Sequence, residues 1–438
     1  MGTKVCKFGG TSLADTGQMQ KVKRIVQDDA DRRFIVPSAP GKREPSDRKI
    51  TDLLYLCHST ACQKKSFDEP FRLISDRYKQ IVNDLGLNLD LQCHLDQICN
   101  DIRSGATADY TASRGEYLCG LIMADWLEMP FIDAKEVIHF DSNGQLNIHR
   151  TDEAFQNRSK QLKQAVIPGF YGSTPNGKIK TFSRGGSDIS GAIVARGVQA
   201  DVYENWTDVS GLLMADPNII ANPQSIDVLS YRELRELAYM GASVLHDEAI
   251  FPVRQAAIPV NIRNTNRPND PGTMIVPETT PIAHTGTITG IAGRKDFTVI
   301  AVEKALMNAE IGFARRLLSI LETQNISFEH LPSGIDTMSL VIADTQLNDK
   351  LDSLLVEIHH SCHPDSLEVY PDMALVATVG RGMSQTPGMA AKIFTALSSA
   401  EVNIRMIDQG SSEINIIVGV HTSDFEKAVR AIYSTFQE

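Results

Sequence analysis

The stretch that decides the fold is Lys4-Val-Cys-Lys-Phe-Gly-Gly-Thr-Ser12. Its apolar part, Val5 to Phe8, predicts a strand, the two glycines predict a turn, and apolar residues at helical spacing from 19 to 26 predict a helix. This order directs free backbone N–H groups at an anion, and the helix dipole favours the negative charge. Lys7 precedes the turn, so its ammonium is a candidate partner of that anion. An ordinary βα turn with a solvated lysine would explain the pattern equally well.

A second diglycine turn strengthens the first. Asn176-Gly177 predicts a hairpin, and Ser183-Arg-Gly-Gly-Ser-Asp188 follows its second strand and precedes an apolar helix. Arg184 offers a planar fork suited to a carboxylate or phosphate. Asp188 lies in the first helical turn, where an acid can also serve only the helix dipole. Two such turns in one domain are much less expected by chance than one, so they predict a paired anion site.

Three further stretches carry candidate polar groups. Ser113-Arg-Gly-Glu116 predicts the start of a helix, with Ser113 as its cap and Glu116 completing a capping box. A strand over residues 201–206 leads into Thr207-Asp208, whose acid can be a turn former and nothing more. The charged segment 42–49 lacks apolar periodicity and follows a strand, which predicts a lid or substrate loop.

Strands and helices alternate to about residue 275, which predicts an α/β domain with a mostly parallel sheet. Later, predicted strands over residues 325–331 and 403–407 each begin with Asn-Ile, so that Ile326 and Ile404 are 78 residues apart, as are Ser333 and Ser411. This repetition predicts two copies of a small α+β unit. The predicted boundaries are a catalytic domain at 1–276, a linker at 277–296 (part of which can pair with the later sheets), and small units at 297–370 and 371–438.

Composition excludes several classes of protein. The 43 basic and 54 acidic residues give a net charge of −11, which argues against a nucleic-acid surface and leaves small ligands. We expect no membrane-spanning helix and no signal peptide. Seven scattered cysteines without a Cys-x-x-Cys pair predict reduced thiols and a cytoplasmic protein. The run at 359–363 lacks a second ligand group at zinc spacing, so no protein metal site is predicted.

Several common nucleotide-binding motifs are absent from the sequence, which excludes the corresponding classes of enzyme. The chain has no Walker phosphate loop, no protein-kinase Gly-rich loop with His-Arg-Asp, and no Gly-x-Gly-x-x-Gly after a strand. A P-loop NTPase, a protein kinase and a dinucleotide dehydrogenase are therefore not expected.

Five motifs together resemble aspartate kinase: Lys7-Phe-Gly-Gly-Thr-Ser12, Ser113-Arg-Gly-Glu116, Ser183-Arg-Gly-Gly-Ser-Asp188, Trp206-Thr-Asp-Val-Ser-Gly211 and Gly241-Ala-Ser-Val-Leu-His246. The repeated units resemble a pair of ACT domains. The resemblance implies a three-layer α/β/α amino-acid-kinase sandwich followed by two ferredoxin-like βαββαβ units. The implied reaction is ATP + L-aspartate → ADP + 4-phospho-L-aspartate, which opens lysine, threonine and methionine biosynthesis.

The resemblance also implies roles for residues. Lys7, held by Asp188, would bind the migrating γ-phosphoryl with the N–H groups of Gly9 and Gly10, since phosphoryl transfer needs positioning and charge stabilisation. Arg184 would clamp the α-carboxylate of aspartate, and Glu116 would pair with its ammonium. The aspartate pocket would also contain Ser38, Thr51 and Ser187. The ATP phosphates, bridged by Mg²⁺, and the nucleotide would contact Gly185, Gly186, Thr207, Asp208, Leu213, Asp216, Asn218, Ser243 and Val244.

Three positions depart from the family pattern on the nucleotide side. Many members have Asp-Pro-Arg where this chain has Asp216-Pro217-Asn218, tyrosine where Leu213 stands, and lysine where Ser243 stands. One expected phosphate cation is therefore missing. Cations of the charged loop are candidates to replace it: Lys42, Arg43, Arg48 and Lys49.

The ACT resemblance implies feedback control by an amino acid, with lysine favoured over threonine, and a homodimer or homotetramer assembled through the ACT units. The implied effector region contains Met307, Phe313, Glu329, Ser333 and Gly334. Two alternatives stay open at this point. One is a kinase of the same fold acting on glutamate, acetylglutamate, carbamate or UMP, and the other is a degenerate kinase that only senses amino acids.

Overall fold

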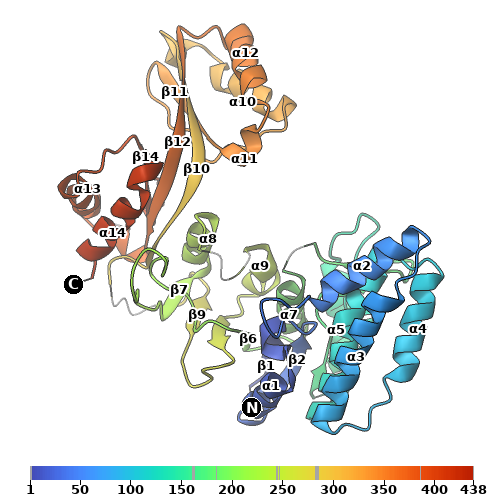
Figure 1. The fold of residues 1–438 in the computed structure, drawn as a ribbon. Helices are drawn as coiled ribbons and strands as arrows, with labels where there is room; N and C mark the ends of the chain where they lie inside the picture. The colour runs from blue at the N-terminus through green and yellow to red at the C-terminus, as the bar shows by residue number, and fades with distance from the viewer. Residues whose placement is uncertain are drawn as a thin grey trace. The chain divides into compact units, whose positions relative to one another are not determined.

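A computed structural model describes residues 2–159, 163–183, 185–242, 245, 247–281, 286–384 and 386–437 (Figure 1). Three predicted site residues, Arg184, Ser243 and Val244, lie outside the described residues. The chain forms two compact units. The first contains Met1–Leu212, Asp227–Tyr231 and Val244–Pro281, and the second contains Leu213–Ile226, Arg232–Ser243 and Ile282–Glu438.

The first unit is built on a seven-stranded sheet in which, over the residues that the structure describes, only β8 and β9 pair antiparallel. The predicted mostly parallel α/β sheet is therefore confirmed. In spatial order the strands are β3 (Ala165–Val166), β2 (Arg32–Pro37), β1 (Lys4–Phe8), β6 (Val202–Thr207), β8 (Val260–Asn264), β9 (Thr273–Val276) and β7 (Val228–Ser230). A separate hairpin joins β4 (Tyr171–Ser173) to β5 (Ile179–Thr181), as the Asn176-Gly177 turn predicted.

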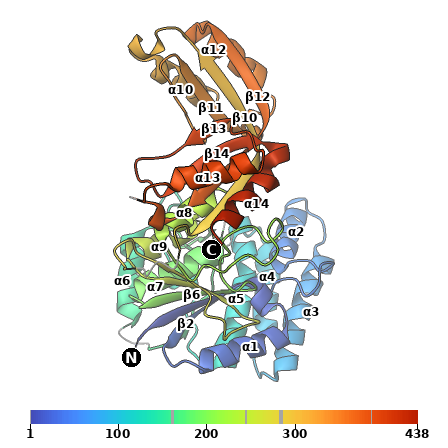
Figure 2. The ribbon, with the colours of Figure 1, turned by 90° about the vertical axis from the view of Figure 1, so that its left-hand side faces the viewer.

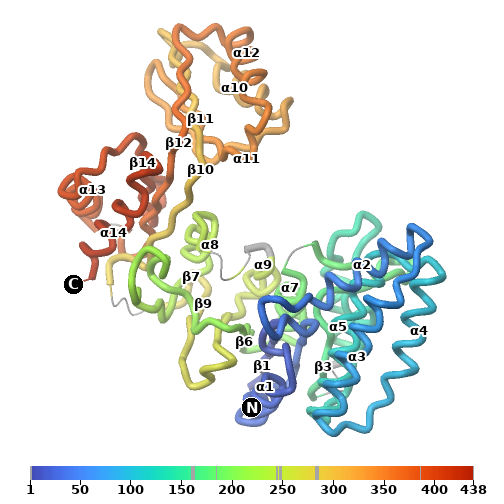
Figure 3. Tube along the Cα trace, viewed as in Figure 1, coloured from blue at the N-terminus to red at the C-terminus, as the bar shows by residue number. Residues whose placement is uncertain are grey.

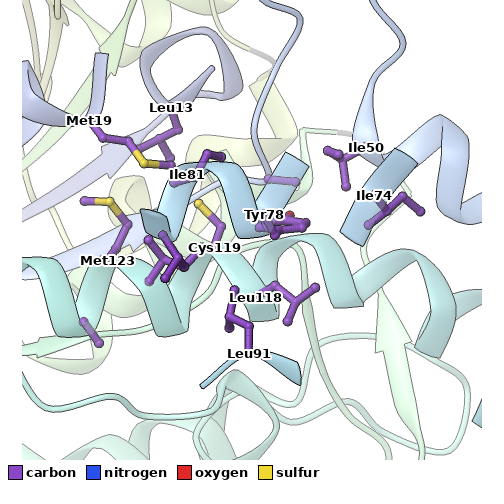
Figure 4. Close-up of a cluster of buried hydrophobic side chains, with 14 of the residues drawn as sticks. Leu13, Met19, Ile50, Ile74, Tyr78, Ile81, Leu91, Leu118, Cys119 and Met123 are labelled. Atoms are coloured by element: carbon purple, nitrogen blue, oxygen red, sulfur yellow. The ribbon is translucent and has the colours of Figure 1, made fainter. Parts of the chain in front are cut away.

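Helices cover both faces of this sheet. Successive residues of a strand point to opposite faces, and β1 places Cys6 and Phe8 in an apolar cluster with residues of five helices. Figure 4 shows part of this cluster, including Met19, Tyr78 and Leu118. Lys7 instead meets Asp188 of α7 on the other face. This is the predicted three-layer arrangement. The helices of this unit are α1 (Thr16–Gln27), α2 (Ile50–Cys62), α3 (Asp68–Leu85), α4 (Gln92–Arg103), α5 (Ala108–Leu127), α6 (Ile148–Ser159), α7 (Gly186–Gly197) and α9 (Asp247–Gln255), with short 3-10 turns at Gly10–Leu13 and Ala134–Glu136.

The second unit contains a five-stranded antiparallel sheet and most of α8 (Tyr231–Tyr239). Within it α10 and α12 are neighbours, as are α13 and α14 (Figure 2). In spatial order the strands are β11 (Thr337–Ala343), β10 (Gly290–Glu303), β12 (Ser366–Val379), β14 (Asn415–His421) and β13 (Met406–Asp408). The helices are α10 (Phe313–Thr323), α11 (Asp344–Leu347), α12 (Leu351–Cys362), α13 (Met389–Ser399) and α14 (Phe425–Thr435), with 3-10 turns at Met307–Ala309, Arg381–Met383 and Thr422–Asp424.

An internal repeat organises this second unit, but with a different offset from the predicted one. Helices α10 and α13 have equal length and start 76 positions apart, at Phe313 and Met389. Each is followed by a residue with left-handed φ, Asn325 at 52° and Glu401 at 51°. Ile326 therefore corresponds to Val402, so its predicted alignment with Ile404 is wrong. The 78-residue offset holds for β11 and β14, which start at Thr337 and Asn415, because two extra residues precede β14.

The two longest strands are themselves copies of each other. Strands β10 and β12 each have 14 residues, start 76 positions apart, and run antiparallel to each other (Figure 3). Their register is irregular between Arg294 and Val299, near the middle of the pair. Gly290 pairs with Val379 at one end of the ladder, and Glu303 pairs with Ser366 at the other. Since these four residues are related by the same offset, the ladder is symmetric about its centre.

Two local predictions are wrong. The predicted capping box at Ser113 fails because α5 already begins at Ala108, where the Thr107 hydroxyl accepts from the Tyr110 N–H at 3.2 Å. The predicted strand over residues 325–331 is reduced to an isolated bridge between His330 and Val341. Among the described helices, none has both the length and the apolar character needed to cross a bilayer.

Candidate functional site

The first glycine turn lies at the carboxyl end of β1. A 3-10 turn from Gly10 to Leu13 stands between the strand and α1, so the predicted direct passage from turn to helix is corrected. The Gly9 N–H donates to the carbonyl of Trp206 at 3.0 Å. Because that donor is already used, the predicted backbone contact with phosphate depends on Gly10.

Lys7 lies beside this turn and is almost completely buried. Its side chain is 9% exposed, and its Nζ is 2.6 Å from Asp188 Oδ1 at the start of α7. The ion pair with this carboxylate holds the ammonium in a fixed direction. The predicted pairing of Lys7 with Asp188 is therefore present in the structure.

Asn205 completes this pair and was missed by the sequence reasoning. It lies directly opposite Lys7 in the parallel register of β1 and β6, and it is 4% exposed. Its Oδ1 accepts from Lys7 Nζ at 3.3 Å, and its Nδ2 donates to Asp188 Oδ1 at 2.9 Å. An amide can bridge a cation and an anion in this way because it carries both a donor and an acceptor. A polar residue inside an otherwise buried central strand was the available signal.

The second glycine turn opens α7, as predicted. Gly185 is the N-cap residue with φ of 56°, a left-handed conformation that favours glycine. A Cβ at Gly186 would come within 2.2 Å of a ring carbon of Phe170, so this position has no room for a side chain. Ser187 and Asp188 then occupy the first helical turn, where N–H groups lack helical partners.

Glu116 is a buried carboxylate on α5, 5% exposed. One of its oxygens accepts from the Ala39 N–H, while Oε2 has no hydrogen-bond partner among the described residues. Burial, opposed by that hydrogen bond, raises the pKa of Glu116 to about 7. Such a group is prepared for a cationic ligand.

The loop after β2 connects Glu116 to the first turn. The Ser38 N–H donates to the Phe8 carbonyl at 3.0 Å, and the next residue, Ala39, holds Glu116. A Cβ at Gly115 would lie 2.9 Å from the Ala39 Cβ, so α5 touches this loop closely. Thr51 is in the first turn of α2, which the same loop leads into. The structure thus brings Lys7, Ser38, Thr51 and Glu116 to the carboxyl ends of β1 and β2.

The predicted nucleotide residues are divided between the units. Thr207 and Asp208 follow β6 in the first unit, with a hydrogen bond of 3.2 Å between their side chains. Leu213, Asp216 and Asn218 belong to the second unit. There the Asn218 side chain donates to Asp216 Oδ1 at 2.9 Å, so it closes a local turn.

The predicted effector residues lie in the first ACT-like repeat and form two groups. Met307 and Phe313 are buried in one apolar cluster with α10 and β11. Ser333 and Gly334 belong to the turn before β11, where the Gly334 N–H donates to the Thr337 carbonyl at 2.7 Å.

Glu329 already has protein partners. Its side chain is 13% exposed, lies 3.7 Å from a guanidinium nitrogen of Arg294, and accepts from the Tyr239 hydroxyl. An effector ammonium would have to share or displace these partners.

Family comparisons match both parts of the chain. Residues 2–264 match the amino acid kinase family, and residues 376–436 match the ACT domain. Aspartokinase 3 of Bacillus subtilis is 39% identical over 99% of this chain and 98% of its own length.

Solved structures extend this similarity to the whole fold. Clostridium acetobutylicum aspartate kinase, described as an allosteric enzyme, is 58% identical with a TM-score of 0.95, over 99% of this chain and 100% of that one. Escherichia coli aspartokinase III is 26% identical over the full length of both chains. It superposes with a TM-score of 0.75 in its complex with aspartate and ADP (R-state), and of 0.74 in its complex with lysine and aspartate (T-state).

Proposed function

Because the chain belongs to the aspartokinase family, we infer that it transfers the γ-phosphoryl group of ATP to the side-chain carboxylate of L-aspartate, giving 4-phospho-L-aspartate. The observation that carries this inference is the buried Lys7 ammonium, fixed by Asp188 and Asn205 beside the first glycine turn. A fixed cation at this point stabilises the charge that spreads over the transferred phosphoryl oxygens.

The acceptor needs little help beyond orientation. The side-chain carboxylate of aspartate is ionised at neutral pH, so no general base is required. We propose that Glu116 binds the ammonium of aspartate and Arg184 its α-carboxylate, with Ser38, Thr51 and Ser187 lining the pocket. When the ammonium and the α-carboxylate of aspartate are both bound, its side-chain carboxylate, which is the nucleophile, is directed at the phosphate.

We propose that ATP enters with Mg²⁺ bound to its phosphates, where the ion neutralises charge and orients the leaving group. Among the described residues, no group of three His, Cys, Asp or Glu is placed to hold a metal ion. Within the first unit we propose that Lys7, Gly10, Gly185 and Gly186 would bind the phosphates. Thr207 and Asp208 would contact the rest of the nucleotide.

A hydroxamate assay tests the proposed function. Purified protein with aspartate, ATP and Mg²⁺ should form aspartyl hydroxamate in the presence of hydroxylamine. Glutamate, acetylglutamate, carbamate and UMP should each support at most a small fraction of that ATP turnover. Turnover with one of these in place of aspartate would indicate the alternative kinase, and binding without turnover would indicate the sensor.

The ACT units support a regulatory proposal. A distant relative was crystallised with lysine and aspartate in a T-state, and we propose that lysine inhibits this chain through Met307, Phe313, Glu329, Ser333 and Gly334. We also propose a homo-oligomer assembled through the ACT units. The seven unpaired cysteines support our prediction of a reducing, cytoplasmic compartment.

Titration of the enzyme with lysine and with threonine should show inhibition by lysine at concentrations that leave threonine without effect. Activity that is indifferent to both amino acids would contradict feedback control without affecting the kinase assignment. Glu329→Gln should weaken lysine inhibition while leaving the uninhibited kcat within twofold.

Asn205→Leu is expected to lower kcat about tenfold, because a hydrogen bond to a charged group contributes about 1.5–3 kcal/mol. The KM for aspartate should stay within threefold, since Asn205 serves Lys7 and Asp188. Steady-state kinetics check this, with Asn266→Leu as a control at an exposed asparagine of the same unit. Equal kcat values for both variants would show that Asn205 has no part in positioning Lys7.

A further inference from the structure

We propose that Arg77 of α3 is a positioning residue that fixes the phosphate turn and the aspartate loop relative to each other, although it belongs to none of the motifs. This proposal rests on the proposed function, because it concerns the alignment of the two reactants. Arg77 is 6% exposed and belongs to the same compact unit as Lys7 and Glu116.

The guanidinium of Arg77 connects three separate pieces of backbone and loop. Its Nη2 donates to the carbonyl of Ala14, which ends the 3-10 turn, at 3.0 Å. The same nitrogen donates to the carbonyl of Gly41, in the loop between β2 and α2. Its Nη1 lies 3.1 Å from Asp47 Oδ2 in the charged segment 42–49. A planar fork is the side-chain shape that can serve all three acceptors at once.

The two backbone pieces that Arg77 joins are in direct contact. The Gly41 N–H donates to the Gly10 carbonyl at 2.8 Å, and a Cβ on Gly41 would lie 2.5 Å from the Gly10 carbonyl carbon. Gly10 is the remaining predicted phosphate donor, and Ala39, two residues before Gly41, holds Glu116. A shift of Gly41 against Gly10 would therefore change the distance between the phosphoryl group and the aspartate pocket.

Asp47 links Arg77 to the charged segment 42–49. Its carboxylate accepts from the Arg43 N–H at 3.1 Å and from Arg43 Nε at 2.9 Å, besides its contact with Arg77. Hydrogen bonding by Arg43 and the nearby Arg77 charge hold the pKa of Asp47 well below its usual range. Arg43 is thus engaged inside the loop, which argues against its predicted role as a replacement phosphate cation.

Stability alone does not account for an arginine at this place. Its Nε has no partner among the described residues, and burying a guanidinium has a high desolvation cost. Buried ion pairs are often replaced by apolar residues without loss of stability. The contacts of Arg77 instead fit a role in fixing the positions of the two reactants. Such positioning matters because misplacement of reactants by about 1 Å can lower the rate about 100-fold.

The test compares Arg77→Met, Arg77→Lys and Asp47→Asn with Arg103→Met. Arg103 is a control because it forms an exposed pair with Asp68, at 2.9 Å and with 56% of its side chain exposed. Arg77→Met should lower kcat per folded molecule about 30-fold, with the KM for ATP and for aspartate each within threefold. Arg77→Lys should not restore kcat, since an ammonium cannot reach both carbonyls, and Asp47→Asn should lower kcat only about threefold.

Chemical rescue separates positioning from general stability. Ethylguanidinium should raise the kcat of Arg77→Ala several-fold and should not change that of Arg103→Ala. A kcat of Arg77→Met within twofold of wild type, or a reduced melting temperature with unchanged kcat per folded molecule, would overturn the proposal. If Arg77→Met does not fold, the Arg77→Lys kinetics and the rescue experiment decide. Absence of hydroxamate formation by the wild-type protein would instead contradict the proposed function itself.

Discussion

Replacing Lys7 by methionine is expected to reduce kcat about 1,000-fold, which corresponds to about 4 kcal/mol of transition-state stabilisation. The expectation follows from the burial of the ammonium and from its contacts with Asp188 at 2.6 Å and Asn205 at 3.3 Å. A cation that needs no reorganisation during the reaction stabilises the transferred phosphoryl more than it stabilises bound ATP. The loss should therefore appear in kcat more than in the KM for ATP.

Lys23→Met provides the matched control for Lys7→Met. Lys23 lies on α1, over the ring of Trp126, with its Nζ 3.9 Å from the ring centroid. The same chemical change there should leave kcat within twofold. Full activity of Lys7→Met would refute the proposed mechanism, and circular dichroism of both variants would show whether the fold is retained.

Glu116→Gln should have opposite effects on binding and on stability. Its carboxylate is the proposed partner of the substrate ammonium, so the KM for aspartate should rise about 100-fold, as is typical when one member of a buried charge pair is removed. The free protein should become more stable at pH 8, because the variant no longer buries an ionised oxygen without a partner. Residues that serve function often lower the stability of the folded protein in this way.

The difference in stability between Glu116→Gln and wild type should depend on pH. The pKa of Glu116 is raised from 4.5 to about 7 in the folded protein, so between these values the folded state holds a proton that the unfolded state has lost. The contribution of Glu116 to the free energy of unfolding therefore falls as pH rises through this window, by about 3 kcal/mol in all. Melting temperatures at pH 5 and pH 8 should show the variant gaining on wild type at the higher pH.

The same titration should be visible in kinetics. For wild type, kcat/KM for aspartate should rise with pH up to about 7 and then level off, since it reports the free enzyme. Glu116→Gln should lack this inflection. A wild-type profile that is flat from pH 5.5 to 8 would contradict the assignment of Glu116 as the ammonium partner.

Local chemistry made much of the site predictable. Glycine turns need particular backbone angles and close approaches, so the first and second turns could be located from the sequence, and Gly185 has the expected left-handed φ. The pairing of Lys7 with Asp188 followed from the family resemblance. Asn205 did not, because its role depends on its being opposite Lys7 across two parallel strands. The sequence analysis also missed Arg77, because its acceptors are 30 or more positions away in the sequence.

Other errors came from competing local signals. Ser113 and Glu116 have capping-box spacing, yet Thr107 caps the helix, which begins at Ala108 and already buries Thr111 and Ala112 before Ser113. The matching Asn-Ile pairs suggested one constant repeat offset, whereas two extra residues in a loop change the offset between the helices and the later strands. A spacing read from the sequence therefore does not reveal residues that were inserted in a loop between two repeated elements.

The symmetric ladder of β10 and β12 has a consequence for the history of the chain. Asp296 and Asp372, 76 positions apart, both have left-handed φ at the centre of the two strands. Removing residues 297–372 would join 290–296 to 373–379 and recreate one strand of the original length. Its antiparallel partner would then have to come from a second molecule. The two ACT-like repeats thus pair inside one polypeptide as two copies of a single self-pairing chain would, which is the result expected from duplication and fusion of its gene.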